Sequence, residues 1–180
     1  MTNLAKSVLV LRACNPDMSS RNGFVWPTSG PVEALDWNPI EECGNGLHGW
    51  LHGHGAGDVC NYTADDCKWL VVKVKTKHIV DLDGKVKFKK GKVVFCGDRK
   101  SATDYLIAND PIASTQPVIA SVVFADDSRN AISTDFGSAT ASRYGLAVSG
   151  GYGVSNCGGH GISISGTNGK STSGYNGISY

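Results

Sequence analysis

Residues 134–173 read TDFGSATA SRYGLAVS GGYGVSNC GGHGISIS GTNGKSTS, five rows of eight residues with a glycine in the fourth place of every row. The closing GYNGISY continues the pattern, and DDSRNAIS at 126–133 is a degenerate first row with Arg129 in place of the glycine. The sixth place of every row holds only alanine or serine. Because a fixed spacing is the mark of a structural repeat, this stretch predicts a folded solenoid rather than a flexible linker.

Each row predicts a strand of about four residues followed by a glycine-assisted corner. Alternation along the strand turns the small residues of the sixth and eighth places inward and the fifth and seventh places outward. The outward places are apolar in every second row, so the true period is sixteen residues, with two strands per coil. One outer face is then apolar, and we expect it to pack on the N-terminal domain, a second copy or a partner. This face consists of Leu146, Val148, Ile162, Ile164 and Ile178.

A change of composition near Ala125 divides the chain. Residues 126–180 hold 12 of the 23 glycines but only three basic and three acidic side chains. In residues 1–125, one segment with a capping residue, 101–109, predicts a helix, and the other ordered segments read as strands. The predicted strands are 7–14, 23–27, 69–75, 85–89, 92–96 and 118–125. The sequence therefore predicts a mainly β, α+β fold, with a β-meander domain and one helix at 1–125 and a β-solenoid of octapeptide repeats at 126–180.

The N-terminal segment lacks the features of a secretory signal. Arg12 interrupts the first apolar run, and no later run reaches the roughly 18 apolar residues of a membrane-spanning helix. We therefore expect a protein without membrane attachment that stays in the cell that makes it. Six cysteines without a C-x-x-C pair are then expected to be free thiols in a reducing compartment.

Positive charge is concentrated in residues 68–100, which carry eleven basic and three acidic side chains. Within two predicted strands the lysines recur with period two and so share one face. These lysines are Lys73, Lys75 and Lys77 in the first strand and Lys85, Lys87 and Lys89 in the second. Pairing of the two strands would assemble six ammonium groups, and Arg99 follows in the sequence. Such a surface predicts binding of nucleic acid, another polyanion or an acidic protein; the alternative is a solvated sheet edge that resists aggregation.

The segment CGNGLHGWLHGHGAGDVC at 43–60 has three histidines between two cysteines. Its candidate metal ligands are Cys43, His48, His52, His54 and Cys60. The spacing matches no standard zinc site, and the glycines disfavour the helix that would bring His48 and His52 together. We interpret the segment as a glycine-rich turn in which His48 packs against the fold, and we expect neither a metal nor another cofactor.

Three motifs carry a resemblance to a group of known proteins. They are C-G-x-G-L-H-G at 43–49, K-V-K-F at 85–88 and V-V-F-C-G-D-R at 93–99, with the short repeats behind them. In these motifs the chain resembles an uncharacterised family of small phage and prophage proteins. The resemblance implies a location in the cytoplasm of a bacterial host and a host protein or ribonucleoprotein as the partner. It also implies a non-enzymatic, anti-CRISPR-like function as an accessory inhibitor of a bacterial defence system.

Two other functions are open at this point. His48 would hold the nicotinamide ribose in an ADP-ribosyltransferase-like enzyme, although the acids near strand ends are Asp81, Asp83 and Asp98 and none is a glutamate. A nucleophilic Cys96 would need His48 as its base. Alternatively, the roll is a structural phage module that forms a homo-oligomer through its apolar face. A carboxylate close to His48 would favour the enzyme, and a stable homo-oligomer would favour the module.

Overall fold

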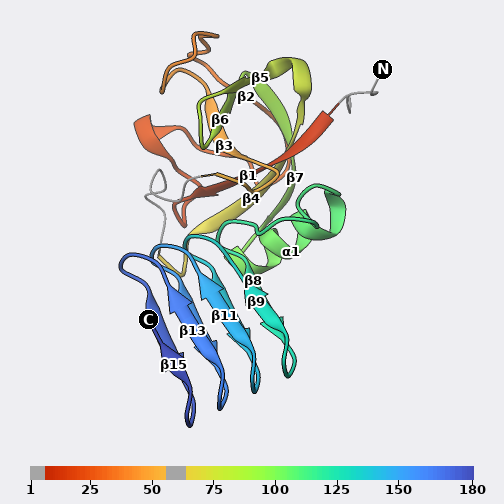
Figure 1. Cartoon of the computed structure of the whole chain (residues 1–180). Coiled ribbons are helices and arrows are strands. Elements are labelled where there is room, and N and C mark those ends of the chain that lie inside the picture. The colour runs from red at the N-terminus through yellow and green to blue at the C-terminus, as the bar shows by residue number, and fades with distance from the viewer. Residues whose placement is uncertain (1–6, 56–63) are drawn as a thin grey trace. The chain divides into compact units, whose positions relative to one another are not determined.

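The computed structural model describes residues 7–55 and 64–180. The chain divides into two compact units, Met1–Gln116 and Pro117–Tyr180, called unit 1 and unit 2 below (Figure 1). The boundary predicted from composition, 125/126, falls inside unit 2, between its first two strands. In the ranges that the structure describes, no helix is long and apolar enough to cross a membrane.

Unit 1 is built on a seven-stranded antiparallel sheet with the spatial order β2-β7-β4-β1-β3-β6-β5. The long central strands β1 and β4 pair along their whole length, from Ser7 opposite Lys75 to Cys14 opposite Lys68. Apolar residues of both strands are fully buried and form the core with Trp26 and residues of β6. The strands are β1 (Ser7–Cys14), β2 (Gly30–Glu33), β3 (Leu47–Leu51), β4 (Lys68–Lys75), β5 (Ile79–Asp81), β6 (Val86–Phe88) and β7 (Lys90–Gly97).

The helix α1 (Arg99–Asn109) confirms the helix predicted at 101–109. Its N-cap is Asp98, whose side chain accepts a hydrogen bond of 2.8 Å from the backbone N–H of Ser101. The helix ends before Asp110 and Pro111, because proline at the second position beyond it cannot continue the backbone hydrogen bonding. A mainly β domain with one helix is thus the observed architecture of unit 1.

Two features of unit 1 differ from the sequence prediction. Residues 23–27 form no strand; Arg21–Gly23 is a 3-10 turn, and the edge strand β2 comes later. The predicted strands 69–75, 85–89 and 92–96 also do not pair in sequence order. Instead, β6 pairs with β3 and β5, and β7 pairs with β4. Local alternation assigns the faces of a strand, whereas its neighbours are set by contacts far apart in the sequence.

Unit 2 is a two-sheet β-solenoid of about four coils, as predicted. Successive strands alternate between the sheets β14-β12-β10-β8 and β15-β13-β11-β9 (Figure 1). All pairing is parallel and joins residues sixteen apart, such as Ser138 with Val154 and Leu146 with Ile162, which confirms the period of sixteen. The strands are β8 (Val122–Ala125), β9 (Asn130–Ile132), β10 (Ser138–Ala141), β11 (Leu146–Ser149), β12 (Val154–Cys157), β13 (Ile162–Ser165), β14 (Lys170–Ser173) and β15 (Ile178–Ser179).

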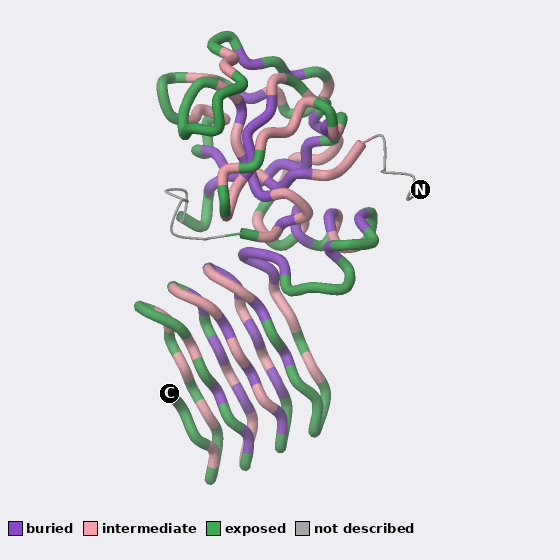
Figure 2. The backbone as a smooth tube through the Cα atoms, turned by 45° about the horizontal axis from the view of Figure 1, so that its top comes forward, coloured by how far each residue is buried: buried purple, intermediate pink, exposed green. Residues whose placement is uncertain are grey.

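The interior of the solenoid is as narrow as the small residues predicted. Four side chains in the sixth place of successive rows are completely buried: Ala139, Ala147, Ser155 and Ser163. Burial alternates from residue to residue along β10, β11 and β12 (Figure 2). Some serine hydroxyls pair across the two sheets, namely Ser149 Oγ with Ser155 Oγ and Ser165 Oγ with Ser171 Oγ, both at 2.8 Å. Because buried hydroxyls are costly without partners, these pairs hold the two sheets at a fixed separation.

The corners differ from the glycine-assisted turns that the sequence predicts. The residue with positive φ is the third of each row, the one before the glycine; φ is between 52° and 61° for Phe136, Tyr144, Tyr152, His160, Asn168 and Asn176. A turn hydrogen bond of 3.2 Å joins Gly153 N–H to the Gly150 carbonyl. The third-place rings stack between coils, with Tyr144 and His160 centroids 5.2 Å apart. The repeated glycine therefore serves close packing and not an unusual φ.

Candidate functional site

The apolar face of the solenoid is an in-register array of branched aliphatic side chains. Leu146, Ile162 and Ile178 are opposite one another on successive strands, and Val148 pairs in the same way with Ile132 and Ile164. Parallel strands are about 4.8 Å apart, so each row repeats at that distance. Ile132, Ile162, Ile164 and Ile178 are each between 36% and 49% exposed, so these side chains contact solvent.

The opposite outer face, on β8, β10, β12 and β14, is the mixed face. One of its ladders runs from Val122 through Ser138 and Val154 to Lys170, and the other from Phe124 through Thr140 and Asn156 to Thr172. Both faces lie on parallel sheets with small inward-facing residues, and they differ most in their outer side chains. Repeating order and rigidity are therefore common to both, and only one offers an aliphatic array.

His48 of β3 lines a pocket of about 910 Å³ within unit 1. Burial, followed by the charges of Lys85 and Arg12, lowers the pKa of His48 to about 4, so its ring is neutral at pH 7. The Gly46 carbonyl accepts a hydrogen bond from the ring and opposes this shift. Asp36 also lines the pocket, whereas Asp81, Asp83 and Asp98 do not.

The predicted metal ligands are not gathered into one site. In the part of the chain that the structure describes, no group of three His, Cys, Asp or Glu side chains is arranged to hold a metal ion. Cys43 is exposed, Cys60 lies outside the described residues, and His52 is engaged elsewhere. The expectation that no metal is bound stays a prediction.

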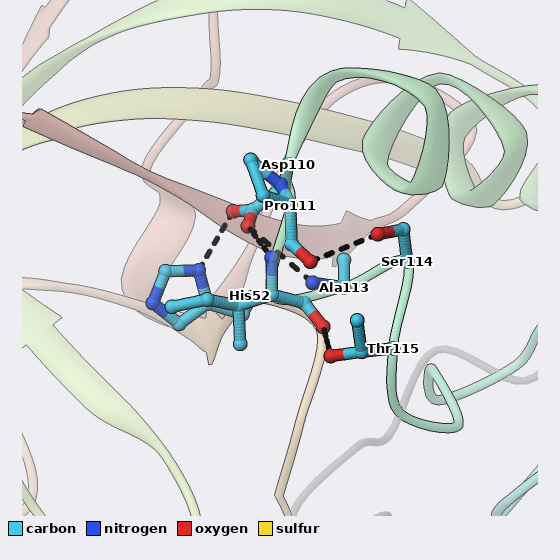
Figure 3. A network of polar contacts seen from close by, with 7 residues as sticks. His52, Asp110, Pro111, Ala113, Ser114 and Thr115 are labelled. Carbon is cyan, nitrogen blue, oxygen red and sulfur yellow. Dashed lines mark hydrogen bonds and ion pairs between the residues drawn. The ribbon is translucent and has the colours of Figure 1, made fainter.

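His52 belongs to a polar network at the end of α1 (Figure 3). His52 Nδ1 lies 2.7 Å from Asp110 Oδ2, and Asp110 Oδ1 accepts hydrogen bonds from the backbone N–H groups of Ile112 and Ala113. Burial by itself would raise the pKa of the Asp110 carboxyl, but the hydrogen bonds from His52 and Ile112 outweigh it and hold the pKa below its ordinary value. The network ties the loop after β3 to the residues after α1.

The structure does not bring the six predicted lysines onto one surface, because β1 and β3 separate β4 from β6. Lys73 and Lys75 are exposed on β4, and Lys77 follows in the 3-10 turn Thr76–His78. Lys87 is buried and donates from Nζ to the Glu42 carbonyl at 2.8 Å, since both faces of β6 are covered. Lys85 directly precedes β6, and Arg99 is the first residue of α1. Lys89 Nζ lies 4.0 Å from Glu33 Oε1.

A basic residue that the sequence reasoning missed lies directly across from Lys73. Lys92 of β7 is its register partner, so the exposed lysines of β4 face those of β7. Only the pairing of distant strands identifies this neighbour. Binding of nucleic acid, another polyanion or an acidic protein by these side chains stays a prediction.

Comparison with known proteins gives two findings. A family model for a domain of unknown function (DUF7666) matches residues 8–106. The chain is also 37% identical to an ice nucleation protein of Xanthomonas campestris pv. translucens over 61% of its length, 38% identical to one of Pseudomonas syringae pv. syringae over 63%, and 32% identical to ice nucleation protein InaU of Pantoea ananas over 61%. These matches cover only 7%, 10% and 11% of the respective relatives. No solved structure matches the chain.

These findings overturn the phage assignment. The relatives are bacterial ice nucleation proteins, so the predicted phage family is wrong, and so is the inhibitor of a bacterial defence system that it implied. The ADP-ribosyltransferase and the structural phage module are wrong for the same reason. The cytoplasm of a bacterial host is also wrong as the location, because it depended on the phage origin. Since the family model covers more than half of the residues, the chain belongs to the family of DUF7666 domain proteins.

Proposed function

We propose that unit 2 binds ice through its apolar face. The observation that carries the proposal is the in-register array of Leu146, Ile162 and Ile178 beside Ile132, Val148 and Ile164 on a rigid sheet. Relatives of the chain are named ice nucleation proteins, which makes water the ligand to consider first.

Apolar side chains restrict the orientation of the water molecules in their first shell. On a mobile surface this ordering averages out, whereas the serine pairs and backbone ladders of unit 2 keep the aliphatic groups in place. The repeat of about 4.8 Å between strands then imposes one spacing on the adjacent water. Water ordered in this way is a template that a growing ice surface can join.

The mixed face is less suited to this function. Lys170 presents an ammonium group, which is strongly hydrated and sits on a flexible stem. Water around such a group follows the charge instead of the lattice of the strands. The apolar face has no charged side chain in its array.

The size of the array sets the expected strength of the effect. A nucleating surface must support an ice embryo of critical size, and that size shrinks as the water is cooled further. Four coils support only a small embryo, and the part of the chain that matches its relatives covers only 7% and 10% of the first two. We therefore expect binding to existing ice and nucleation only under strong supercooling.

Partitioning of the full chain into slowly growing ice tests the proposal. Ile162→Lys on the apolar face and Val154→Lys on the mixed face form a matched pair, because the wild-type side chains are 38% and 37% exposed. We expect the wild type and Val154→Lys to be enriched in the ice, and Ile162→Lys to remain in the liquid. Equal loss in both variants, or no enrichment of the wild type, would overturn the proposal.

A further inference from the structure

Four lysines lie side by side on the face of the unit 1 sheet that is turned away from the core. Lys73 and Lys75 of β4 alternate with valines that are buried in the core, so the lysine side chains point outward. Lys92 of β7 is the register partner of Lys73, and the next position along the two strands sets Lys90 opposite Lys75. All four side chains are exposed. They are called the lysine face below.

The charge of the lysine face is not balanced by acidic side chains. Among the described residues, none of its four lysines forms an ion pair with Asp or Glu. Glu33 lies opposite Lys90 on β2, but its Oε1 atom is 4.0 Å from Lys89 Nζ. Burial, followed by the charges of four lysines that include Lys75 and Lys90, lowers the pKa of the nearby His78 ring. The lysine face is therefore a surface of uncompensated positive charge.

The place of these lysines in the sheet argues against a role as an aggregation-resistant edge. Exposed edge strands often carry lysine because its charge opposes pairing with another chain. However, β7 is flanked by β2 and β4, and β4 is flanked by β7 and β1, so neither strand is an edge. Like charges directly opposite each other also destabilise a sheet. Neither protection of an edge nor stability of the fold accounts for the pair of Lys73 and Lys92.

We propose that the lysine face binds double-stranded DNA through its phosphates, without reading the base sequence. A DNA duplex carries one negative charge per about 1.7 Å of its axis, a high and regular density. Opposite lysines are about 5 Å apart across the strands, and successive lysines are about 7 Å apart along a strand. Several phosphates of one duplex therefore lie within reach of the four side chains. The proposal concerns unit 1 alone and does not depend on ice binding by unit 2.

The residues beside the lysine face favour DNA phosphates over other partners. Leu9 and Pro31 are the outer register partners of Lys73 and Lys92, and neither has a hydrogen-bonding side chain for base edges or ribose hydroxyls. None of the register partners of the lysine face is an aromatic residue on which the bases of a single strand could stack. The lysine face also contains no arginine, whose planar fork holds a carboxylate of an acidic protein in one geometry.

Counterion release gives the expected binding a measurable salt dependence. Each phosphate that a lysine neutralises contributes about −0.9 to the slope of log K against log salt concentration for duplex DNA. Lys77 follows β4 and is also exposed, so that five lysines are available for phosphate contacts. The slope is then about −4.5, and the affinity should fall about 500-fold between roughly 50 mM and 200 mM salt.

Fluorescence anisotropy of a short labelled DNA duplex, titrated with the full chain at several salt concentrations, tests the proposal. Lys73→Gln/Lys92→Gln removes two contacts, so the slope should become about −2.7 and the same change of salt should weaken binding only about 40-fold. Lys100→Gln/Lys170→Gln is the matched control with the same change of net charge. Lys100 is paired with Asp104, and Lys170 belongs to unit 2. We expect the control to keep the slope of the wild type.

The melting temperature separates loss of binding from loss of fold. Because Lys73→Gln/Lys92→Gln removes a pair of exposed like charges, the variant should melt at or above the temperature of the wild type. The four tryptophans are all in unit 1, so their fluorescence follows this unit. Should the variant melt at a lower temperature, Lys75→Gln/Lys90→Gln removes the other opposite pair and carries the same expected slope.

Two duplexes of different sequence should bind with affinities within about twofold of each other, since phosphate contacts carry no sequence information. Three results would overturn the proposal. They are equal salt slopes in the variant and its control, no binding of the duplex at about 50 mM salt, and tighter binding of a competing polyanion than of the duplex. The competing polyanions are single-stranded DNA, polyglutamate and vesicles that contain phosphatidylglycerol.

Discussion

Replacing Gly153 by alanine tests why a glycine recurs in the fourth place of every row. A Cβ atom there would lie 2.6 Å from Ser149 Cβ and 3.0 Å from the carbonyl oxygen of Gly137. The second atom belongs to the backbone of the preceding coil, so the added methyl group must push two coils apart. Overpacking of this kind costs about 1–3 kcal/mol. For a unit of this size, ~2 kcal/mol lowers the melting temperature by roughly 8–16 °C.

Gly151→Ala is the matched control in the same turn. The nearest atom to its Cβ would be the Thr167 carbonyl oxygen at 3.4 Å, an ordinary contact. Neither glycine has a positive φ, so backbone strain does not enter the comparison. The reduced freedom of the unfolded chain alone then predicts a stabilisation of about 0.4–1 kcal/mol for Gly151→Ala.

Hydrogen exchange measured by mass spectrometry follows unit 2 separately from unit 1. The four tryptophans, Trp26, Trp37, Trp50 and Trp69, are all in unit 1, so their fluorescence reports the other half of the chain. We expect Gly153→Ala to accelerate exchange in the coils around residue 153 and to leave the fluorescence melt unchanged. Equal exchange in the two alanine variants would refute the argument that this glycine serves close approach.

Two further predictions concern Asp110 and the apolar face. Asp110→Asn should destabilise unit 1 by about 1–3 kcal/mol at pH 7, because a charged acceptor for His52, Ile112 and Ala113 is lost. The pKa of Asp110 is lower in the folded than in the unfolded chain, so the difference in unfolding free energy between the wild type and Asp110→Asn is complete above the unfolded pKa of about 4. It disappears as the pH falls through the folded pKa. Urea unfolding at neutral and acidic pH measures this difference, and one that persists in acid would contradict the role given to the Asp110 carboxylate. Four strands spaced about 4.8 Å apart and about 13 Å long give the apolar face an area of about 250 Å². Stable interfaces bury about 800 Å² per partner, which is far more. Light scattering should therefore give a monomer, and a dimer that Ile162→Lys dissociates would make the face an interface instead.

The solenoid was predictable because its constraints are local and repeated. Small residues in the sixth place imply a narrow interior, and the alternation of outer residues between rows implies two strands per coil. The role of the glycine was not predictable in the same way. A glycine can mark a positive φ or a close approach, and sequence alone does not separate the two. The structure assigns the positive φ to Tyr152 and the close approach to Gly153.

The lysine surface failed as a prediction for a different reason. Period two correctly turns Lys73 and Lys75 to one side of β4. It does not say that β7 lies beside β4, or that β6 is covered on both faces and buries Lys87. Strand order in unit 1 depends on pairings between residues far apart in the chain, which no local pattern encodes.

The resemblance carried by the N-terminal motifs predicts a function that the relatives contradict. The motif at 43–49 lies on β3 and the loop before it, where it lines the pocket, and the motif at 93–99 lies on β7 and the start of α1, away from the pocket. The same sequence also predicts the aliphatic array of unit 2, as a surface for another part of the chain, a second copy or a partner to cover. Water is the alternative partner of an apolar surface, and the relatives direct attention to it.

The difference between the two outer faces of unit 2 is the strongest argument for a function there. Folding of the solenoid depends on the interior residues and on the glycines, which are alike under both faces. Strand formation also does not require aliphatic residues at the outward-facing positions. The mixed face forms the same kind of parallel ladder with Ser138, Asn156 and Lys170 at those positions. An exposed row of Leu146, Ile162 and Ile178 therefore adds little that folding needs. The ice binding proposed above would explain the regularity of this row, because ordered water can adopt the spacing of the strands. Unlike a protein partner, water needs no large complementary surface to contact the row.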